Sequence, residues 1–175
     1  MIEKMSESKR KEPKEKLDLE LLIVEDDFVN TVAAHIYFQK IKEVKIDFAT
    51  TYEEGKKKLE EKVYAGAIID WHIPQSKGKS PEKVGFDLGK IAEKYAVDYI
   101  IFTGGIGHSG KPTVFIYPLG EKSMKKETKH PGKAESEAWG EAYKALQEIW
   151  YDADELFKTK LRYKKLTEKS YVKKD

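Results

Sequence analysis

Short apolar runs alternate with segments of helical periodicity along most of the chain. Leu19–Val24 is apolar apart from Glu20 and leads into three acidic residues, which is typical of a buried parallel strand. Residues 28–41 carry apolar side chains at three- and four-residue spacing, which predicts an amphipathic helix with Asp27 as its N-cap. The chain is therefore expected to begin with a strand and a helix joined by an acidic turn.

The same alternation continues through the middle of the chain. Val44–Ala49 alternates between apolar and polar residues and predicts a second strand, and a short lysine-rich helix follows it. The start of that helix fits two capping boxes, one of Thr50 with Glu53 and one of Thr51 with Glu54. The remaining predicted elements are strands at 64–69, 99–102 and 113–119, a helix at 84–95, and a long helix at 133–157.

Strands that alternate with helices predict an α/β fold with helices on both faces of a parallel sheet. We expect a flavodoxin-like, doubly wound sheet of five parallel strands in the order 2-1-3-4-5. Residues 106–112 predict a glycine-rich loop in place of the fourth helix, and 121–131 a basic loop. The domain should cover residues 17–158, between a charged arm at 1–16 and a basic extension at 159–175.

Composition narrows the possible chemistry. The chain of 175 residues has no cysteine, which excludes disulfides and thiolate catalysis. No apolar run approaches the roughly 20 residues needed to span a bilayer, and the N-terminus lacks the apolar core of a signal peptide. We therefore expect a cytoplasmic protein with no membrane partner. The formal charge of +2 gives little support for a nucleic-acid partner.

Acidic residues follow two of the predicted strands. Glu25 and Asp26 come after the first strand, and Asp70 comes after the third. The order 2-1-3-4-5 places the ends of these strands side by side at the point where the strand order reverses. Three neighbouring carboxylates repel one another, and a hard divalent cation such as Mg²⁺ is the usual way to relieve that repulsion. The sequence therefore predicts a magnesium site.

The same edge of the sheet offers groups that suit a phosphoryl ligand. Thr103 ends the fourth strand, where its hydroxyl can donate to a phosphate, and the N–H groups of Gly104 and Gly105 follow it. Asp70 is then placed to attack a phosphoryl group and form an acyl phosphate, which is established chemistry for a carboxylate nucleophile.

Three stretches together resemble the receiver domains of two-component response regulators, the CheY-like family. They are 23–27 (IVEDD), 68–74 (IIDWHIP) and 101–104 (IFTG). The resemblance covers roughly 17–157. Gly85 matches the glycine that opens the third helix of these domains.

The resemblance implies a role for each residue of the acidic edge. Asp70 would be the phosphoacceptor, and Glu25 and Asp26 would hold Mg²⁺ together with Asp70. The backbone carbonyl of His72 would be a further ligand, and Thr103 would be the hydroxyl that moves toward the phosphoryl group. A histidine kinase or phosphotransfer protein would then supply the phosphoryl group.

The chain departs from the family pattern in three places. Residues 76–83 lengthen the loop after the acid and would form a flap beside the site, and 106–112 is too short for an ordinary fourth helix. Receivers also end their fifth strand with a Lys-Pro pair, and the equivalent pair here is Tyr117-Pro118. The family lysine is therefore expected to be missing. Lys111 and Lys122 lie nearby in the sequence, but neither ends that strand, and the sequence does not specify whether either takes the place of the lysine.

Three functions fit these observations. The first is a stand-alone atypical receiver that accepts phosphate on Asp70 and signals by binding an unspecified downstream protein. The second is a pseudo-receiver that acts as an interaction module without phosphorylation. The third is a Mg²⁺-dependent phosphatase, which is disfavoured because His72 stands where such an enzyme would have a second aspartate. The sequence does not specify the kinase or the oligomeric state.

Overall fold

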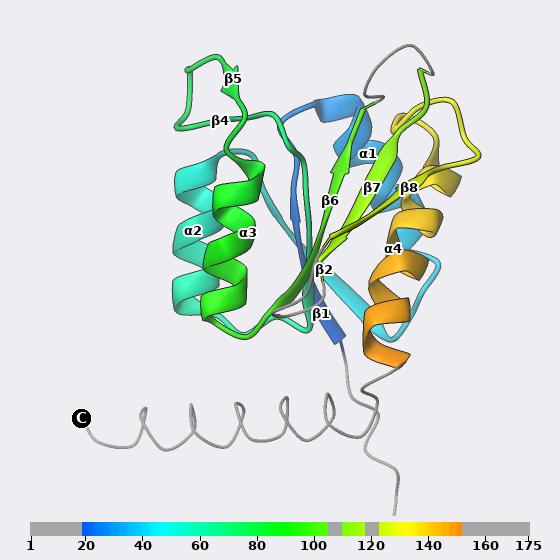
Figure 1. Ribbon diagram of the computed structural model, residues 1–175, viewed down its shortest axis with the longest axis horizontal. Helices are drawn as coiled ribbons and strands as arrows, with labels where there is room; N and C mark the ends of the chain where they lie inside the picture. Colours follow the sequence, from blue (N-terminus) through cyan, green and yellow to red (C-terminus); the bar gives the residue numbers. More distant parts are fainter. Residues whose placement is uncertain (1–18, 105–109, 118–122, 152–175) are drawn as a thin grey trace, which may run out of the picture.

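The computed structural model describes residues 19–104, 110–117 and 123–151 (Figure 1). The predicted segments 1–16 and 159–175 lie outside this part, as does most of the 106–112 loop. The strands are β1 (Leu19–Val24), β2 (Val44–Ala49), β3 (Gly66–Ile69), β4 (Ile73–Pro74), β5 (Pro81–Glu82), β6 (Asp98–Thr103), β7 (Thr113–Tyr117) and β8 (Met124–Glu127). The helices are α1 (Phe28–Phe38), α2 (Tyr52–Glu61), α3 (Gly85–Lys94) and α4 (Ser136–Tyr151).

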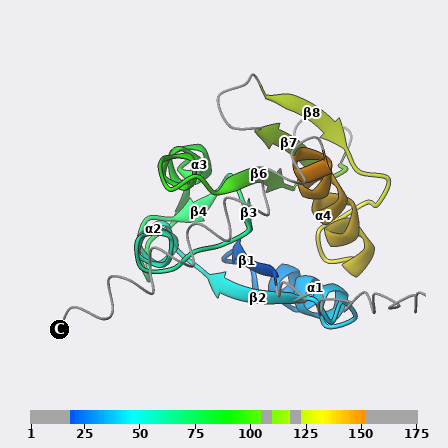
Figure 2. The ribbon, with the colours of Figure 1, turned by 90° about the horizontal axis from the view of Figure 1, so that it is seen from below.

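One central sheet separates two layers of helices. Helices α2 and α3 cover one face, and α1 and α4 cover the other (Figures 1 and 2). Strands β1, β3 and β6 are apolar on both sides because they supply buried side chains to both cores. The α/β class predicted from the alternation of elements is confirmed. None of the helices in the described part is long and apolar enough to cross a membrane.

The large sheet has six strands in the order β2-β1-β3-β6-β7-β8. Its first four strands pair in parallel, so the predicted order 2-1-3-4 is confirmed for them. The prediction of five parallel strands is wrong, because β7 runs antiparallel to β6 and β8 runs antiparallel to β7. The sheet is therefore flavodoxin-like over four strands and mixed beyond them.

The reversal of β7 follows from the length of the preceding connection. Only nine residues separate Thr103 from Thr113, whereas a crossover between parallel strands needs about a dozen or more. The chain therefore returns directly, and Thr103 pairs with Thr113 at the edge where β6 ends.

Strand β8 lies within residues 121–131, where the sequence predicts a basic loop, so that prediction is wrong for 124–127. All four residues of β8 are exposed, so the strand has no apolar alternation that could reveal it. Its charged side chains suit the edge of a sheet, where they discourage pairing with another chain. Because β7 is reversed, β8 again runs in the direction of β6.

The helix starts follow the local predictions closely. Asp27 caps α1 by accepting hydrogen bonds from the backbone N–H groups of Val29 and Asn30. Thr51 caps α2 and accepts from the N–H of Glu54, while the Glu54 carboxylate accepts from the N–H of Thr50. The predicted capping box of Thr51 with Glu54 is therefore present, except that the Glu54 side chain bonds the N–H of Thr50 and not the N–H of the N-cap residue Thr51.

The loop after Asp70 forms the predicted flap in a more ordered way than expected. Strands β4 and β5 pair antiparallel, with Ile73 opposite Glu82 and Pro74 opposite Pro81. Ile73 is fully buried and anchors the base of this hairpin, while β5 is exposed.

Candidate functional site

The three predicted acids meet at the C-terminal edge of the parallel strands. The backbone hydrogen bonds between the strands extend to the acids themselves. The Glu25 N–H donates to the carbonyl of Ala49, and the Asp70 N–H donates to the carbonyl of Val24. One carboxylate oxygen from each of Glu25, Asp26 and Asp70 lies within 4.8 Å of the others. The structure thus brings together the acids that the strand order predicted to be neighbours.

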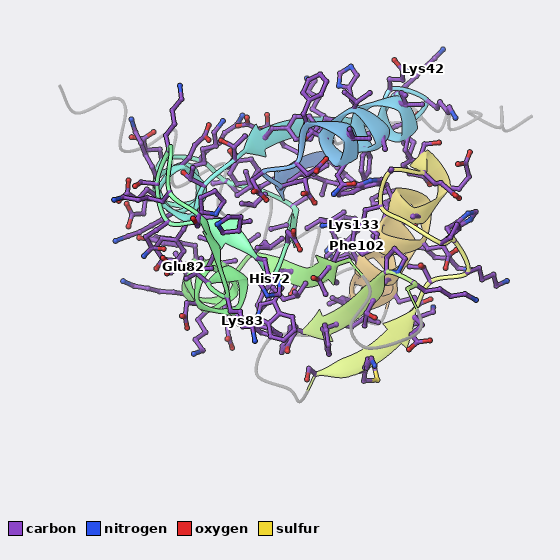
Figure 3. The ribbon with its side chains drawn as sticks, turned by 90° about the horizontal axis from the view of Figure 1, so that it is seen from above. Lys42, His72, Glu82, Lys83, Phe102 and Lys133 are labelled. Atoms are coloured by element: carbon purple, nitrogen blue, oxygen red, sulfur yellow. The ribbon has the colours of Figure 1, made fainter. Side chains whose placement is uncertain are left out.

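A buried lysine completes this acid cluster. The Nζ atom of Lys133 lies 2.5 Å from Oε2 of Glu25 and 3.0 Å from Oδ2 of Asp70. It also donates to the carbonyl of Phe102 at 3.3 Å, and Figure 3 shows the two side chains next to each other. The exposed fractions are 4% for the Lys133 side chain and 1% for that of Glu25, so their charges are paired inside the protein.

The position of Lys133 results from the two extra antiparallel strands. After β8 the chain passes along the edge where β6 ends, and the N–H of Thr128 donates to the carbonyl of Pro112. The segment then leads into α4, where Nε1 of Trp139 donates to the carbonyl of Lys133 at 2.7 Å. The lysine therefore lies between the last strand and the last helix.

The prediction of a missing lysine at Tyr117 is therefore corrected. Because β7 is reversed, Tyr117 pairs with Tyr99 at the opposite end of the strands from the acids, and the two rings stack at 5.2 Å. Lys111 is exposed, and Lys122 lies outside the described residues. In the sequence Lys133 is the first residue of the helix predicted at 133–157, and no local pattern distinguishes it from the other lysines.

Burial and mutual charge perturb the ionisation of this cluster. Burial raises the pKa of Glu25, and the positive charge of Lys133 offsets only part of that rise. Burial, with a smaller contribution from the charge of Asp70, also raises the pKa of Asp26. Burial alone would lower the pKa of Lys133, but the charges of Glu25 and Asp70 outweigh it and raise that pKa. The lysine is therefore held as an ammonium ion.

The donor set fits a hard divalent cation. Three carboxylates facing one ammonium leave two negative charges uncompensated, which matches the charge of Mg²⁺. Oxygen ligands from carboxylates, with water completing the shell, are what Mg²⁺ prefers. Asp26, which is only half-buried, leaves an approach to the cluster from solvent.

Asp70, His72 and Thr103 each make local contacts of their own. Oδ1 of Asp70 accepts the N–H of Trp71 at 2.7 Å, which fixes the carboxylate orientation. The His72 side chain is exposed, and its ring lies against that of Trp71 with centroids 5.0 Å apart. Thr103 is buried at the end of β6, and its hydroxyl lies 3.5 Å from the carbonyl of Gly104. Beside it, the buried hydroxyl of Thr113 has no hydrogen-bond partner within the described part of the chain.

Gly85 occupies the position that the family resemblance gave it, at the first residue of α3. Its N–H donates to the carbonyl of Trp71 at 3.0 Å. A Cβ atom at this position would lie 2.0 Å from the carbonyl oxygen of Asp70. Glycine is therefore required for α3 to start against the backbone that carries the acid.

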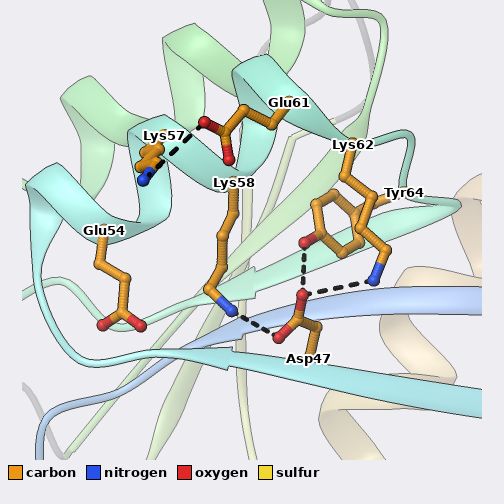
Figure 4. Close-up of a pocket in the computed structure, with 7 residues that line it drawn as sticks. All are labelled: Asp47, Glu54, Lys57, Lys58, Glu61, Lys62 and Tyr64. Carbon is orange, nitrogen blue, oxygen red and sulfur yellow. Dashed lines mark hydrogen bonds and ion pairs between the residues drawn. The ribbon is translucent and has the colours of Figure 1, made fainter. Parts of the chain in front are cut away.

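A second polar cluster lies between α2 and β2, in an open hollow of about 490 Å³ (Figure 4). Asp47 accepts from Lys58 at 2.6 Å and from the hydroxyl of Tyr64 at 2.7 Å, and Lys62 lies 3.4 Å away. These bonds lower the pKa of Asp47 to about 2 despite the opposing effect of burial. Since the charges of this cluster are paired with each other, its role is to fasten α2 to β2.

Comparisons with known proteins give limited similarity. No family model matches the sequence, and no curated protein matches it. Among solved structures, a mutant of the MaeR response regulator bound to sulfate is 23% identical with a TM-score of 0.42, over 51% of this chain and 70% of its own. The RcsB response regulator of Salmonella typhimurium is 16% identical with a TM-score of 0.42, over 51% of this chain and 43% of its own.

Proposed function

We propose that this chain is a receiver-like domain that accepts a phosphoryl group on Asp70 with the help of Mg²⁺. The observation that carries the proposal is the cluster of Glu25, Asp26 and Asp70, with Lys133 paired to the acid that would react. The motif resemblance of 23–27, 68–74 and 101–104 to receiver domains supports the same roles.

In the proposed reaction, a carboxylate oxygen of Asp70 forms a bond to the phosphorus of a phosphohistidine. The bond between phosphorus and the imidazole nitrogen breaks, and that nitrogen keeps the electron pair and takes up a proton. Bound Mg²⁺, held by Glu25, Asp26 and Asp70 with the carbonyl of His72, would neutralise charge on the phosphoryl oxygens. The Lys133 ammonium supplies a further positive charge at Asp70, and Thr103 supplies a hydroxyl at the adjoining strand end.

A protein is the phosphodonor that best suits the surface beside the acids. Large apolar side chains are exposed along α1: Phe28 (79%), Val29 (57%), Val32 (38%) and Ile36 (41%). The first turn of this helix reaches the site, because Nδ2 of Asn30 donates to Oε1 of Glu25 at 3.2 Å. An apolar stripe next to charged chemistry favours docking of a protein over capture of a small phosphoester.

A pseudo-receiver is the second candidate, and one observation favours it. Lys133 already pairs with both Glu25 and Asp70, so the cluster is partly neutralised without a metal. In that case the domain would act as an interaction module, and Asp70 would serve to hold the lysine.

The two candidates are separated by phosphorylation with a small donor. The full chain is incubated with Mg²⁺ and acetyl phosphate, and intact mass is followed for the addition of one phosphoryl group. We expect a base-labile adduct that Asp70→Asn abolishes and that Asp87→Asn, at an exposed acid on α3, leaves unchanged. If no adduct forms and beryllofluoride does not bind, the pseudo-receiver is supported. Continuous release of phosphate from small phosphoesters would instead indicate a phosphatase.

A further inference from the structure

We propose that Trp139 is a positioning residue for the Lys133 ammonium and that it transmits the state of Asp70 to the start of α4. This inference rests on the proposed function, because it concerns the regulation of the same site. Its starting point is that Lys133 is held at both ends. The ammonium binds Glu25 and Asp70, while the backbone carbonyl accepts the indole N–H of Trp139.

The indole ring is fixed in place by its surroundings. Trp139 is 1% exposed, and its ring meets that of Phe102 edge to face, with centroids 5.1 Å apart. The carbonyl of Phe102 in turn accepts from Nζ of Lys133. Lys133, Phe102 and Trp139 therefore form a closed ring of contacts behind the acid cluster.

The segment around Lys133 is fastened to α4 by further bonds. The N–H of Lys129 donates to both carboxylate oxygens of Glu141, at 3.0 and 3.1 Å. Each ring nitrogen of His130 also faces a carboxylate, Nδ1 that of Glu135 at 3.1 Å and Nε2 that of Glu141 at 3.4 Å. Residues 129–133 and the first turns of α4 therefore form one connected unit.

A change at Asp70 must consequently reach α4. A phosphoryl group on Asp70 adds oxygens and negative charge at the carboxylate that Lys133 contacts, so the ammonium has to change its position or its partners. The bond from Trp139 couples the Lys133 backbone directly to α4, with no intervening strand or loop. The start of α4 is therefore the part of the surface that responds.

The test uses the indole N–H signals of the three tryptophans, Trp71, Trp139 and Trp150, in nitrogen–proton correlation spectra of the full chain. Each signal is assigned with a Trp→Phe variant, and spectra are compared before and after addition of Mg²⁺ and beryllofluoride. Trp71 adjoins Asp70 and reports occupancy of the site, whereas Trp150 is a control near the other end of α4. We expect the Trp71 and Trp139 signals to shift and the Trp150 signal to stay.

The Lys133→Met variant tests the route of transmission. In this variant the Trp71 signal should still shift and the Trp139 signal should not. A Trp139 signal that stays in the wild type while Trp71 shifts overturns the inference and leaves the proposed function standing, as does a Trp139 shift that persists in Lys133→Met. If no indole signal moves, both the inference and the proposed function are overturned.

The Trp139→Phe variant tests positioning separately. Phenylalanine keeps a ring against Phe102 but removes the donor to the Lys133 carbonyl. Loss of one buried hydrogen bond should slow labelling of Asp70 by acetyl phosphate about three- to tenfold. In the Lys133→Met background the same change should have no further effect, and Trp150→Phe should label at the wild-type rate. Additive losses in the double variant would assign Trp139 a packing role and overturn the inference.

Discussion

Replacing Lys133 by methionine removes the cation from the acid cluster and retains a side chain of similar length. At an effective dielectric constant of about 20, contacts of 2.5 Å to Glu25 and 3.0 Å to Asp70 each correspond to about 5 to 7 kcal/mol of gross Coulomb energy. The cost of removing the ammonium from water offsets several kcal/mol of this Coulomb energy. We therefore expect the variant to lose about 3 to 5 kcal/mol of the free energy of unfolding at pH 7.5 without Mg²⁺.

The pH dependence of this loss follows from Glu25. Burial raises the pKa of Glu25, and without Lys133 that pKa should rise further. A carboxyl group with a raised pKa holds more protons in the folded than in the unfolded state, so stability falls as the pH rises above the ordinary carboxyl value. The deficit of Lys133→Met should therefore be larger at pH 8 than at pH 5.

Urea unfolding followed by far-UV circular dichroism measures the effect, with Lys129→Met as the control because Lys129 is exposed in the same segment. A concentration of Mg²⁺ about 100 times its Kd should restore about 2.7 kcal/mol to the Lys133 variant, since the cation replaces the missing charge. Equal midpoints for the variant and the wild type without Mg²⁺ would refute this reasoning, as would a deficit that acid leaves unchanged or a variant midpoint that Mg²⁺ does not raise.

Two further predictions concern the support of the site and the second polar cluster. Gly85→Ala should cost about 2 kcal/mol and slow labelling of Asp70 by acetyl phosphate, because the new Cβ meets the Asp70 carbonyl. Gly104→Ala, where a Cβ meets nothing within 4 Å, is its control in urea unfolding. Asp47 has its pKa lowered to about 2 and should contribute up to about 2 kcal/mol of stability above pH 4, lost as the pH falls toward 2. Asp47→Asn should thus be less stable than the wild type at pH 7, and the difference should shrink to less than about 0.5 kcal/mol at pH 2. Asp87→Asn should differ little from the wild type at either pH. Parallel pH curves of the wild type and Asp47→Asn would contradict the assignment.

The first four strands of the large sheet could be predicted because each has a pattern that its surroundings require. β1, β3 and β6 are buried on both faces, so their sequences are continuous apolar runs. The acidic residues after β1 and β3 could be assigned to one site for the same reason, since parallel strands place their ends at a common edge.

The direction of β7, the existence of β8 and the position of Lys133 depend on information that a local sequence pattern does not contain. Apolar alternation in Thr113–Tyr117 indicates a strand but is the same in both directions, so the reversal of β7 could be inferred only from the short connection before it. β8 is exposed throughout and has no pattern at all. Lys133 is one of 33 basic residues, and its partners are set by the positions of β7 and β8. The sequence alone therefore predicts that the lysine is missing.

The pairing of Glu25 with Lys133 has a consequence for the order in which the domain folds. The two residues are 108 positions apart in the chain, which makes this one of the costly long-range contacts that usually form late. A ribosome-bound chain can assemble β1, β3 and Asp70 well before residue 133 has been synthesised. Until then Glu25 and Asp70 lack their cation and repel each other. The acid cluster should consequently reach its charge-paired form only when β8 and the start of α4 are in place.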